Sequence, residues 1–339
     1  MHPLISVILP VRDAAATLPA ALSSLAAQSF KDFELIVTDH GSTDDTRALL
    51  DGWYDAFAQL RKSVILSETP FTDVLNGGCA ACRGRFVARM DADDVCHPDR
   101  FRLQVEHLLQ HPETGVVASR VAFGGDPRAQ AGYARYVRWI NTLLTHDDMA
   151  LACFRESPIA HPSVMFRREL ISRYGGYRDG SFPEDYELWL RWFDAGVRFE
   201  KLPETLLTWN DPPNRLSRVH PNYAVENFYA VKAEYLARWL ARNNPHYPDV
   251  LIVGAGRVTR RRVQKLIEKG IRVIAWADLD PAKIGRVYHN APVIHHDDIP
   301  APGTAFVVPF VSAIGAADQI RAMLESRGYS RGRDFIEAA

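Results

Sequence analysis

The stretch that decides the fold is Phe86-Val-Ala-Arg-Met-Asp-Ala-Asp-Asp-Val95. Its apolar first half is typical of a buried strand, and three carboxylates, Asp91, Asp93 and Asp94, follow at once. A cluster of acids at the end of a buried strand is costly unless something positive binds there. Ligands of open α/β sheets bind outside the carboxyl ends of the strands. The stretch therefore predicts a divalent-cation site and, with it, a phosphate-bearing substrate.

The sequence before this stretch alternates between strand-like and helix-like segments. We expect strands at residues 5–10 and 34–39 and a weaker one at 63–67, with helices at 19–28, 43–53 and 75–82. Ser42 and Asp45 form a capping-box-like start for the second of these helices. Such β-α-β-α-β alternation predicts a largely parallel sheet that is covered by helices on both faces.

A second α/β unit is expected from Asp249 onward, after a long helix at 223–242 and a polar, proline-containing linker. Gly254-Ala-Gly-Arg-Val-Thr259 is two-thirds of a dinucleotide fingerprint, with Thr259 in place of the third glycine. Asp278 stands about where a ribose-binding acid belongs. We rank a structural or oligomerising module first, a nucleotide-binding regulatory module second and a dehydrogenase a distant third.

Composition limits the class of protein. A chain of 339 residues suits two domains, and its net charge of -1 argues against a general nucleic-acid binder. No apolar run approaches the roughly 20 residues that span a bilayer, and the N-terminus does not read as a secretory signal. Four cysteines do not indicate a disulfide scaffold. The expectation is a cytoplasmic protein.

Six motifs then occur in a fixed order along residues 3–218. They are Ser6-Val-Ile-Leu-Pro10, the segment from Leu25 to Thr46, Ala88-Arg-Met-Asp-Ala-Asp-Asp94, Pro98-Asp-Arg100, His161-Pro-Ser163 and Glu184-Asp-Tyr-Glu-Leu-Trp189. Together they resemble the family 2 glycosyltransferases. The resemblance implies a GT-A (nucleotide-diphospho-sugar transferase) Rossmann-like domain at 1–218. A connecting helix and linker at 219–248 and a small Rossmann-like α/β domain at 249–339 would follow, as in some bacterial members.

The resemblance also implies a nucleotide-sugar donor and a divalent metal, Mn²⁺ or Mg²⁺. It makes Asp93 the metal ligand and places Asp91 at the ribose or the metal, with Asp94 supporting the loop. Capping of the helix after Pro98 is a competing interpretation, but it explains Asp94 better than it explains all three acids. The histidine that the family often carries near residues 210–217 is missing, so Asp211 is expected as the third ligand, with His220 as the alternative.

The general base is the next residue that the resemblance identifies. Inversion at the anomeric carbon requires a base that takes the proton of the acceptor hydroxyl. Asp185 matches the family's base position, with Glu184 as its neighbour. Both acids stand in the first turn of a helix, where negative charge is also favoured by the helix dipole, and the two roles are compatible.

The resemblance places Pro10, Asp39 and His40 around the nucleoside and adds Arg100 and His161 to the donor-binding residues. His40 stands where a second acid is usual, so uridine should not be assumed as the base.

The function that we expect is transfer of a sugar to a hydroxyl of a cell-surface glycan or lipid-linked acceptor, in the second case from the inner face of the membrane. Homo-oligomers, and a nucleotide in the C-terminal domain, remain open at this point. The alternatives are a nucleotide-binding sensory or scaffold protein, and nucleotidyl transfer. The latter would require a basic, glycine-rich loop after the first strand, and Pro10-Val-Arg-Asp-Ala-Ala-Ala16 is not one.

Overall fold

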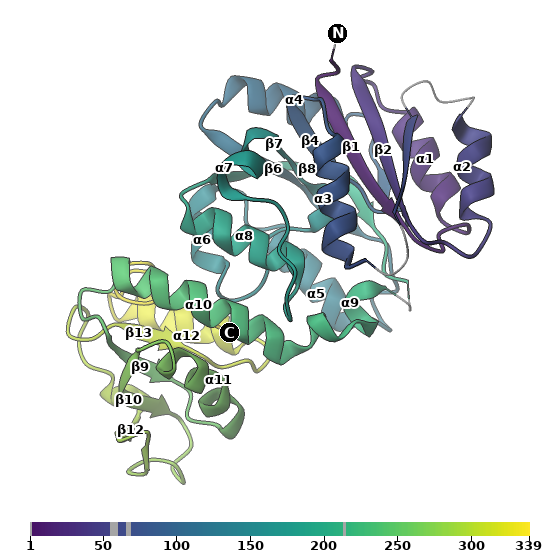
Figure 1. Ribbon diagram of the computed structural model, residues 1–339. Helices are drawn as coiled ribbons and strands as arrows, with labels where there is room; N and C mark the ends of the chain where they lie inside the picture. Colours follow the sequence, from purple (N-terminus) through teal and green to yellow (C-terminus); the bar gives the residue numbers. More distant parts are fainter. Residues whose placement is uncertain (1, 55–59, 66–68, 213–214) are drawn as a thin grey trace. The chain divides into compact units, whose positions relative to one another are not determined.

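The computed structural model describes residues 2–54, 60–65, 69–212 and 215–339 (Figure 1). By its internal contacts the chain divides into two compact units. The first comprises residues 1–149, 158–180 and 187–221, and the second comprises residues 150–157, 181–186 and 222–339. Two short segments from the middle of the chain, 150–157 and 181–186, thus belong to the second unit.

One mixed sheet organises the described part of the first unit. Its order is β3-β2-β1-β4-β7-β6-β8-β5. The strands are β1 (Ile5–Val11), β2 (Phe33–His40), β3 (Leu60–Ile65), β4 (Phe86–Arg89), β5 (Val95–Cys96), β6 (Thr114–Phe123), β7 (Met165–Arg167) and β8 (Arg198–Trp209). The first four pair in parallel, as expected from the alternation, whereas β7 and β5 run antiparallel to their neighbours. Of the strand expected at 63–67, residues 66 and 67 lie outside the described residues.

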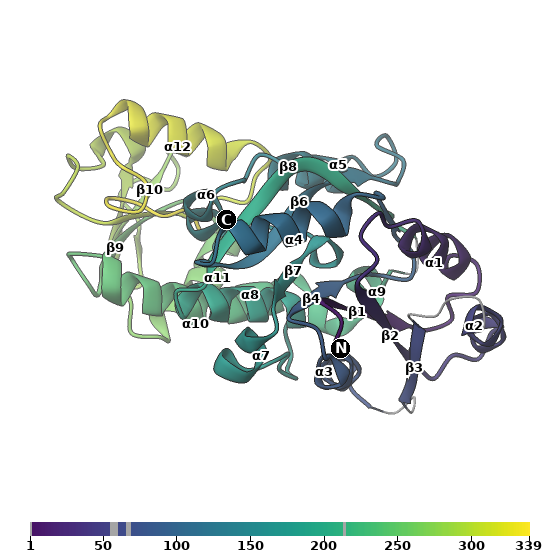
Figure 2. The same cartoon turned by 90° about the horizontal axis from the view of Figure 1, so that it is seen from above.

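Helices cover both faces of this sheet, as the alternation predicts. Leu18 and Leu22 of α1, Phe101 of α4 and the inward side chains of β1 share one core cluster. On the other face α3 lies so close that a Cβ added to Gly78 would stand 3.3 Å from Ile8 Cγ2. Figure 2 shows α3 on the opposite side of β1 and β2 from α1 and α4. Helices that begin in this unit or span both units are α1 (Leu18–Ala26), α2 (Thr46–Tyr54), α3 (Phe71–Ala81), α4 (Arg100–Gln110), α5 (Ala131–Ile140), α6 (His146–Ala152), the 3-10 helix η1 (His161–Ser163), α7 (Glu169–Tyr174), α8 (Glu184–Asp194), α9 (Leu216–Val219) and η2 (Pro221–Tyr223).

The start of α2 differs from the capping-box expectation. The helix begins at Thr46, and Ser42 has another role. Its hydroxyl donates to Asp39 Oδ1 over 2.6 Å and accepts the main-chain N–H of Asp13 over 3.0 Å. Because the hydroxyl joins the loops that follow β1 and β2, it does not cap the helix.

The second unit contains a smaller sheet of order β11-β12-β10-β9-β13. All its pairings are parallel except that of β11 with β12. Its elements are α10 (Val225–Asn243), β9 (Asp249–Val253), α11 (Arg257–Ile267), β10 (Arg272–Asp278), β11 (Val287–Tyr288), β12 (Ala291–His295), η3 (His296–Asp298), β13 (Val307–Pro309) and α12 (Ala316–Ser326). The last residues of the chain run alongside β13, and the N–H of Ala338 donates to Pro309 O over 2.9 Å. Phe335 and Ile336 are fully buried there.

The structure gives no support to a nucleotide in the second unit. Asp278, the expected ribose ligand, accepts hydrogen bonds from the N–H groups of Ala255 (2.8 Å) and Asp280 (2.9 Å). Lys283 Nζ lies 3.1 Å from the same carboxylate. Oδ1 therefore holds the turn after β10, and Oδ2 ties it to the glycine turn after β9.

None of the helices in the described residues is both long enough and apolar enough to cross a membrane.

Candidate active site

The three acids that follow β4 form one cluster. Among the described residues, carboxylate oxygens of Asp91, Asp93 and Asp94 all lie within 4.8 Å of one another. Asp94 is 1% exposed, and its Oδ1 accepts the N–H of Asn210 over 2.8 Å. Its Oδ2 is buried without a hydrogen-bond partner among the described residues. A buried carboxylate oxygen without a partner is costly, so this donor set fits a divalent cation with a preference for oxygen ligands.

The electrostatics of this acid cluster point the same way. Burial, followed by the negative charge of Asp91, raises the pKa of Asp93 to about 6. Burial and the charges of Asp91 and Asp93 raise the pKa of Asp94 well above its ordinary value. Carboxylates that repel one another in a buried place retain protons unless a positive charge is supplied. A bound cation would reverse both shifts.

Two arginines partly balance the negative charge of the acid cluster. Arg89 donates to Asp91 Oδ1 over 2.6 Å. Arg215 stands over two aromatic rings, 4.3 Å from the centroid of Trp209 and 5.1 Å from that of Tyr133. Burial opposes the charge of Arg215, but the charges of the Tyr133 oxygen and of the acid cluster outweigh it and raise its pKa. Sequence reasoning missed Arg215. Its available signal was an arginine a few residues after the tryptophan that ends the last long strand.

Asp211, the expected third metal ligand, is placed otherwise. Its carboxylate is fully buried and pairs with Arg218, whose Nε donates over 3.0 Å, and Arg215 Nη1 lies 3.9 Å away. Within the described residues, the group of close carboxylates that contains Asp93 includes neither Asp211 nor the alternative, His220. The structure thus brings Asp211 together with arginines and not with the acid cluster.

The residues that were predicted to hold the nucleoside meet at the carboxyl ends of β1 and β2. Pro10 pairs with Thr38, so it lies beside Asp39 at the same edge as the acid cluster. Although burial alone would raise the pKa of Asp39, hydrogen bonds from Ser42 and Arg47 hold it below its ordinary value. Asp39 is therefore a charged and firmly held carboxylate.

A main-chain carbonyl sets the tautomer of His40. Its Nε2 lies 2.8 Å from the carbonyl oxygen of Thr69. A carbonyl only accepts, so Nε2 carries the proton and, in the neutral ring, Nδ1 is left as an acceptor. In this tautomer the imidazole can accept a hydrogen bond, as the usual acid would.

Arg100 and His161 lie beneath the site rather than on its surface. Arg100 is fully buried, and its Nη2 donates to the carbonyls of Arg89 (2.8 Å) and Val164 (3.2 Å). The prediction of direct donor contact by Arg100 therefore does not agree with its placement, because the guanidinium is used to hold the end of β4. His161 Nε2 lies 2.7 Å from Tyr177 Oη. Burial, and then the charge of Arg89, lower the pKa of His161 well below its ordinary value, so the ring is neutral.

Glu184 and Asp185 begin α8, in the segment that belongs to the second unit. Glu184 is buried, and Tyr223 Oη lies 2.7 Å from each of its carboxylate oxygens. Asp185 is half-buried, and its Oδ1 accepts the N–H of Tyr186 over 2.7 Å. Both acids stand in the first turn of α8, where the helix dipole favours negative charge.

Arg215 gives a first test of the charge balance at the acid cluster. Arg215→Gln should enlarge the rise in melting temperature that Mn²⁺ produces without donor, because a positive charge near the cation is removed. The same change should weaken binding of a nucleoside diphosphate in Mn²⁺ by about tenfold, since one charge-assisted contact is lost. Thermal melting and calorimetry measure the two effects. Arg138→Gln, on the exposed face of α5, is the control, and equal shifts for both variants would contradict the assignment.

Comparison with known proteins identifies the family. The model of "Glycosyl transferase family 2" matches residues 6–175, half of the chain. A glycosyltransferase of amylovoran biosynthesis from Erwinia amylovora is 28% identical over 56% of this chain and 69% of its own. An O-antigen biosynthesis glycosyltransferase from Escherichia coli is 29% identical over 61% and 79%.

A solved structure shows the same type of fold. The first 349 residues of S. aureus TarS match with a TM-score of 0.53 at 18% identity, over 79% of this chain and 70% of that one. The large curled α/β sheet of the first unit agrees with the GT-A fold. The chain belongs to glycosyl transferase family 2 and is a nucleotide-sugar-dependent glycosyltransferase.

Proposed function

We propose that the protein is an inverting, metal-dependent glycosyltransferase that adds a sugar to a hydroxyl of a cell-surface glycan or lipid-linked acceptor. The observation that carries the metal dependence is the acid cluster with the orphaned Oδ2 of Asp94. Relatives support the substrate class. One, from Escherichia coli and 25% identical over 71% of this chain, is named a β-1,3-galactosyltransferase that uses UDP-Gal and a diphosphoundecaprenol-linked GlcNAc. TarS has also been solved in complex with UDP-GlcNAc.

The donor half of the mechanism follows from the residues at the strand ends. Asp93 and Asp91 would hold a divalent cation, and the cation would supply Lewis-acid stabilisation of the diphosphate leaving group. Asp39, buried and bonded to Ser42 and Arg47, shapes the nucleoside end of the site. His40 Nδ1 accepts a hydrogen bond from a base N–H, so a uracil or another base with such a donor fits. Arg215 offsets the charge that remains between acids and diphosphate. Arg100 and His161 act as positioning residues from beneath the loop.

The acceptor half is proposed from the family resemblance. Asp185 takes the proton of the acceptor hydroxyl as its oxygen attacks the anomeric carbon, and inversion follows from attack on the face opposite the leaving group. Glu184, which Tyr223 holds on both oxygens, fixes the start of α8 and with it the backbone that carries Asp185. The second unit is proposed to be a Rossmann-like module with a structural or oligomerising role. A cytoplasmic place, with lipid-linked acceptors reached at the inner face of the membrane, belongs to the same proposal.

A panel of nucleotide sugars tests this function. One donor should raise the melting temperature of the protein in Mn²⁺ but not in EDTA. Even without acceptor, the enzyme should slowly hydrolyse that donor and release a nucleoside diphosphate. Donor binding without any release, with acceptor glycans present, would favour the sensory alternative and contradict transfer.

A further inference from the structure

The first unit has a charged cavity at the end of the sheet opposite the acid cluster, where β1 and β4 begin. It has a volume of about 700 Å³ and is lined by residues that precede β1 and β4 and residues at the end of β7. Four arginines, Arg83, Arg85, Arg167 and Arg168, line it against two carboxylates, Asp32 and Glu169. We call it the arginine pocket. Its size is typical of small-molecule sites.

The arginines differ in how much of their hydrogen-bonding capacity is already used. Arg83 is paired with Glu34, and Arg167 donates through Nε and Nη2 to carbonyls of the main chain. Among the described residues, the guanidinium of Arg85 has neither an ion pair nor a hydrogen bond, and Arg168 uses only Nε, on Gly84 O. Arg85 and Arg168 are therefore free to bind a ligand.

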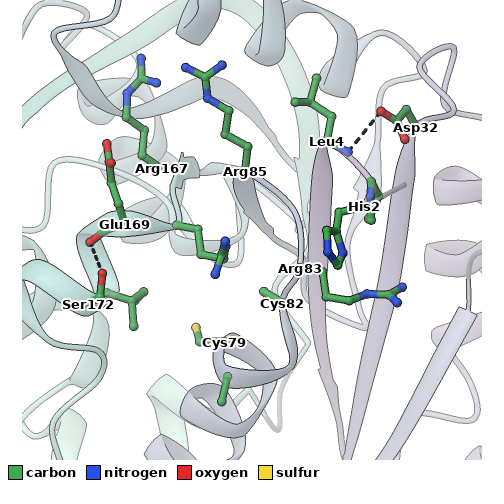
Figure 3. Close-up of a pocket in the computed structure, with 14 residues that line it drawn as sticks. His2, Leu4, Asp32, Cys79, Cys82, Arg83, Arg85, Arg167, Glu169 and Ser172 are labelled. Atoms are coloured by element: carbon green, nitrogen blue, oxygen red, sulfur yellow. Dashed lines mark hydrogen bonds between the residues drawn. The ribbon is translucent and has the colours of Figure 1, made fainter.

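Like charges are held close together at this place. Arg167 is the cross-strand partner of Phe86, and the guanidinium groups of Arg85 and Arg167 lie 5.4 and 5.7 Å from the centroid of that one ring. Figure 3 shows the two side chains extending side by side. Burial, followed by the charge of Arg85, lowers the pKa of Arg167. Neighbouring positive charges repel one another, and an anion bound between them would remove that cost.

The wall formed by α3 is of a different character. Cys79 and Cys82 face the pocket from the end of this helix, and Ile171 lies on α7. Burial raises the pKa of the Cys79 thiol, so it is neutral and a poor nucleophile or metal ligand. The pocket thus joins a cationic wall to an uncharged one, which suits a phosphate group that carries an organic substituent.

We propose that the arginine pocket is a second anion site, which binds the phosphate group of a small phosphorylated ligand away from the donor site. The ligand chemistry can come from a free phosphorylated metabolite or from the headgroup of an anionic phospholipid. Ligands of open α/β sheets bind at the carboxyl ends of strands, and this pocket lies at the amino ends of β1 and β4, so it is separate from donor binding. The inference does not depend on the proposed transfer reaction.

The test measures binding of inorganic pyrophosphate to the full chain by calorimetry in EDTA, which keeps metal from the acid cluster. Wild type should bind, more weakly as salt rises. Arg85→Gln with Arg168→Gln should weaken binding about a hundredfold, since each charge-assisted contact is worth roughly tenfold. Arg138→Gln, on the exposed face of α5, should bind as wild type does. The double lysine variant at 85 and 168 should retain intermediate affinity, because the charge stays and the planar fork is lost.

A second experiment distinguishes a free phosphorylated ligand from a phospholipid headgroup. Vesicles that contain phosphatidylglycerol are compared with phosphatidylcholine vesicles in a sedimentation assay with the same variants. Capture by the anionic vesicles that is lost in the double glutamine variant identifies a headgroup, and pyrophosphate binding without capture identifies a free phosphorylated ligand. The proposal is overturned if wild type binds neither probe, or if the double glutamine variant, folded as judged by its melting temperature, binds them as well as wild type.

Discussion

Asp93→Ala is expected to weaken metal-dependent donor binding on the order of a hundredfold or more and to remove sugar transfer. The loss of an outer partner of a metal ligand already costs about 10–100-fold, and Asp93 is proposed to be a direct ligand. Removing it leaves Asp91 and the buried Asp94 without the third member of their cluster. The measurement is calorimetric titration of the donor in Mn²⁺, with transfer assayed in parallel.

The pH dependence of metal binding adds a signature that loss of folding would not give. Metal ligands must be deprotonated, and the pKa of Asp93 is raised to about 6, so the Mn²⁺ affinity of wild type should increase as pH rises from 5 to 7. Asp93→Asn should lose much of this dependence. Glu113→Ala, which removes an exposed acid at the start of β6, is the control and should keep it. If Asp93→Asn bound donor in Mn²⁺ as tightly as Glu113→Ala does, Asp93 would not be a ligand.

Asp185→Asn should lower the rate of sugar transfer by about 10²–10⁴-fold, the usual contribution of a general base, while donor affinity in Mn²⁺ stays unchanged. The substitution separates the two roles of the residue. Asparagine serves at a helix start about as well as aspartate, so the contact with the N–H of Tyr186 can persist, whereas the ability to take a proton is lost.

Two comparisons support the interpretation of that result. Asp179→Asn changes an exposed aspartate that lies before the same helix and should transfer sugar at the wild-type rate. Glu184→Gln should lower the melting temperature, because the buried carboxylate that holds Tyr223 loses its charge. Near-normal transfer by Asp185→Asn would show that another residue is the base.

The sequence was sufficient where a feature is local. The apolar run into Asp91, Asp93 and Asp94 predicted both the buried strand and the acid-lined loop, because buried parallel strands and ligand sites at their ends follow from short-range patterns. Pro10 and Asp39 were assigned to the nucleoside by the family resemblance, and the parallel pairing of β1 with β2 brings them to one end of the sheet. The shift of α2 to Thr46 shows where locality fails, since Ser42 is engaged by Asp13, 29 residues away in the chain.

The features that the sequence did not predict depend on contacts between segments that are distant in the chain. Arg215 reaches Tyr133 across 82 residues, and Arg100 reaches Val164 across 64 residues. No pattern in the sequence distinguishes an arginine that holds carbonyls from one that contacts a ligand. The arginine pocket is a similar case, because residues 83 and 85 meet residues 167 and 168 only through the pairing of β4 with β7.

The central claim is that the acid cluster binds the donor through a divalent cation. The most direct measurement is calorimetric titration of the best-stabilising nucleotide sugar into wild-type protein, first with Mn²⁺, then with EDTA, then with Mn²⁺ in excess of the chelator. The account predicts tight donor binding with Mn²⁺ and a loss of affinity on the order of a hundredfold with EDTA. Excess Mn²⁺ should restore the full affinity. Equal affinity with Mn²⁺ and with EDTA would contradict it.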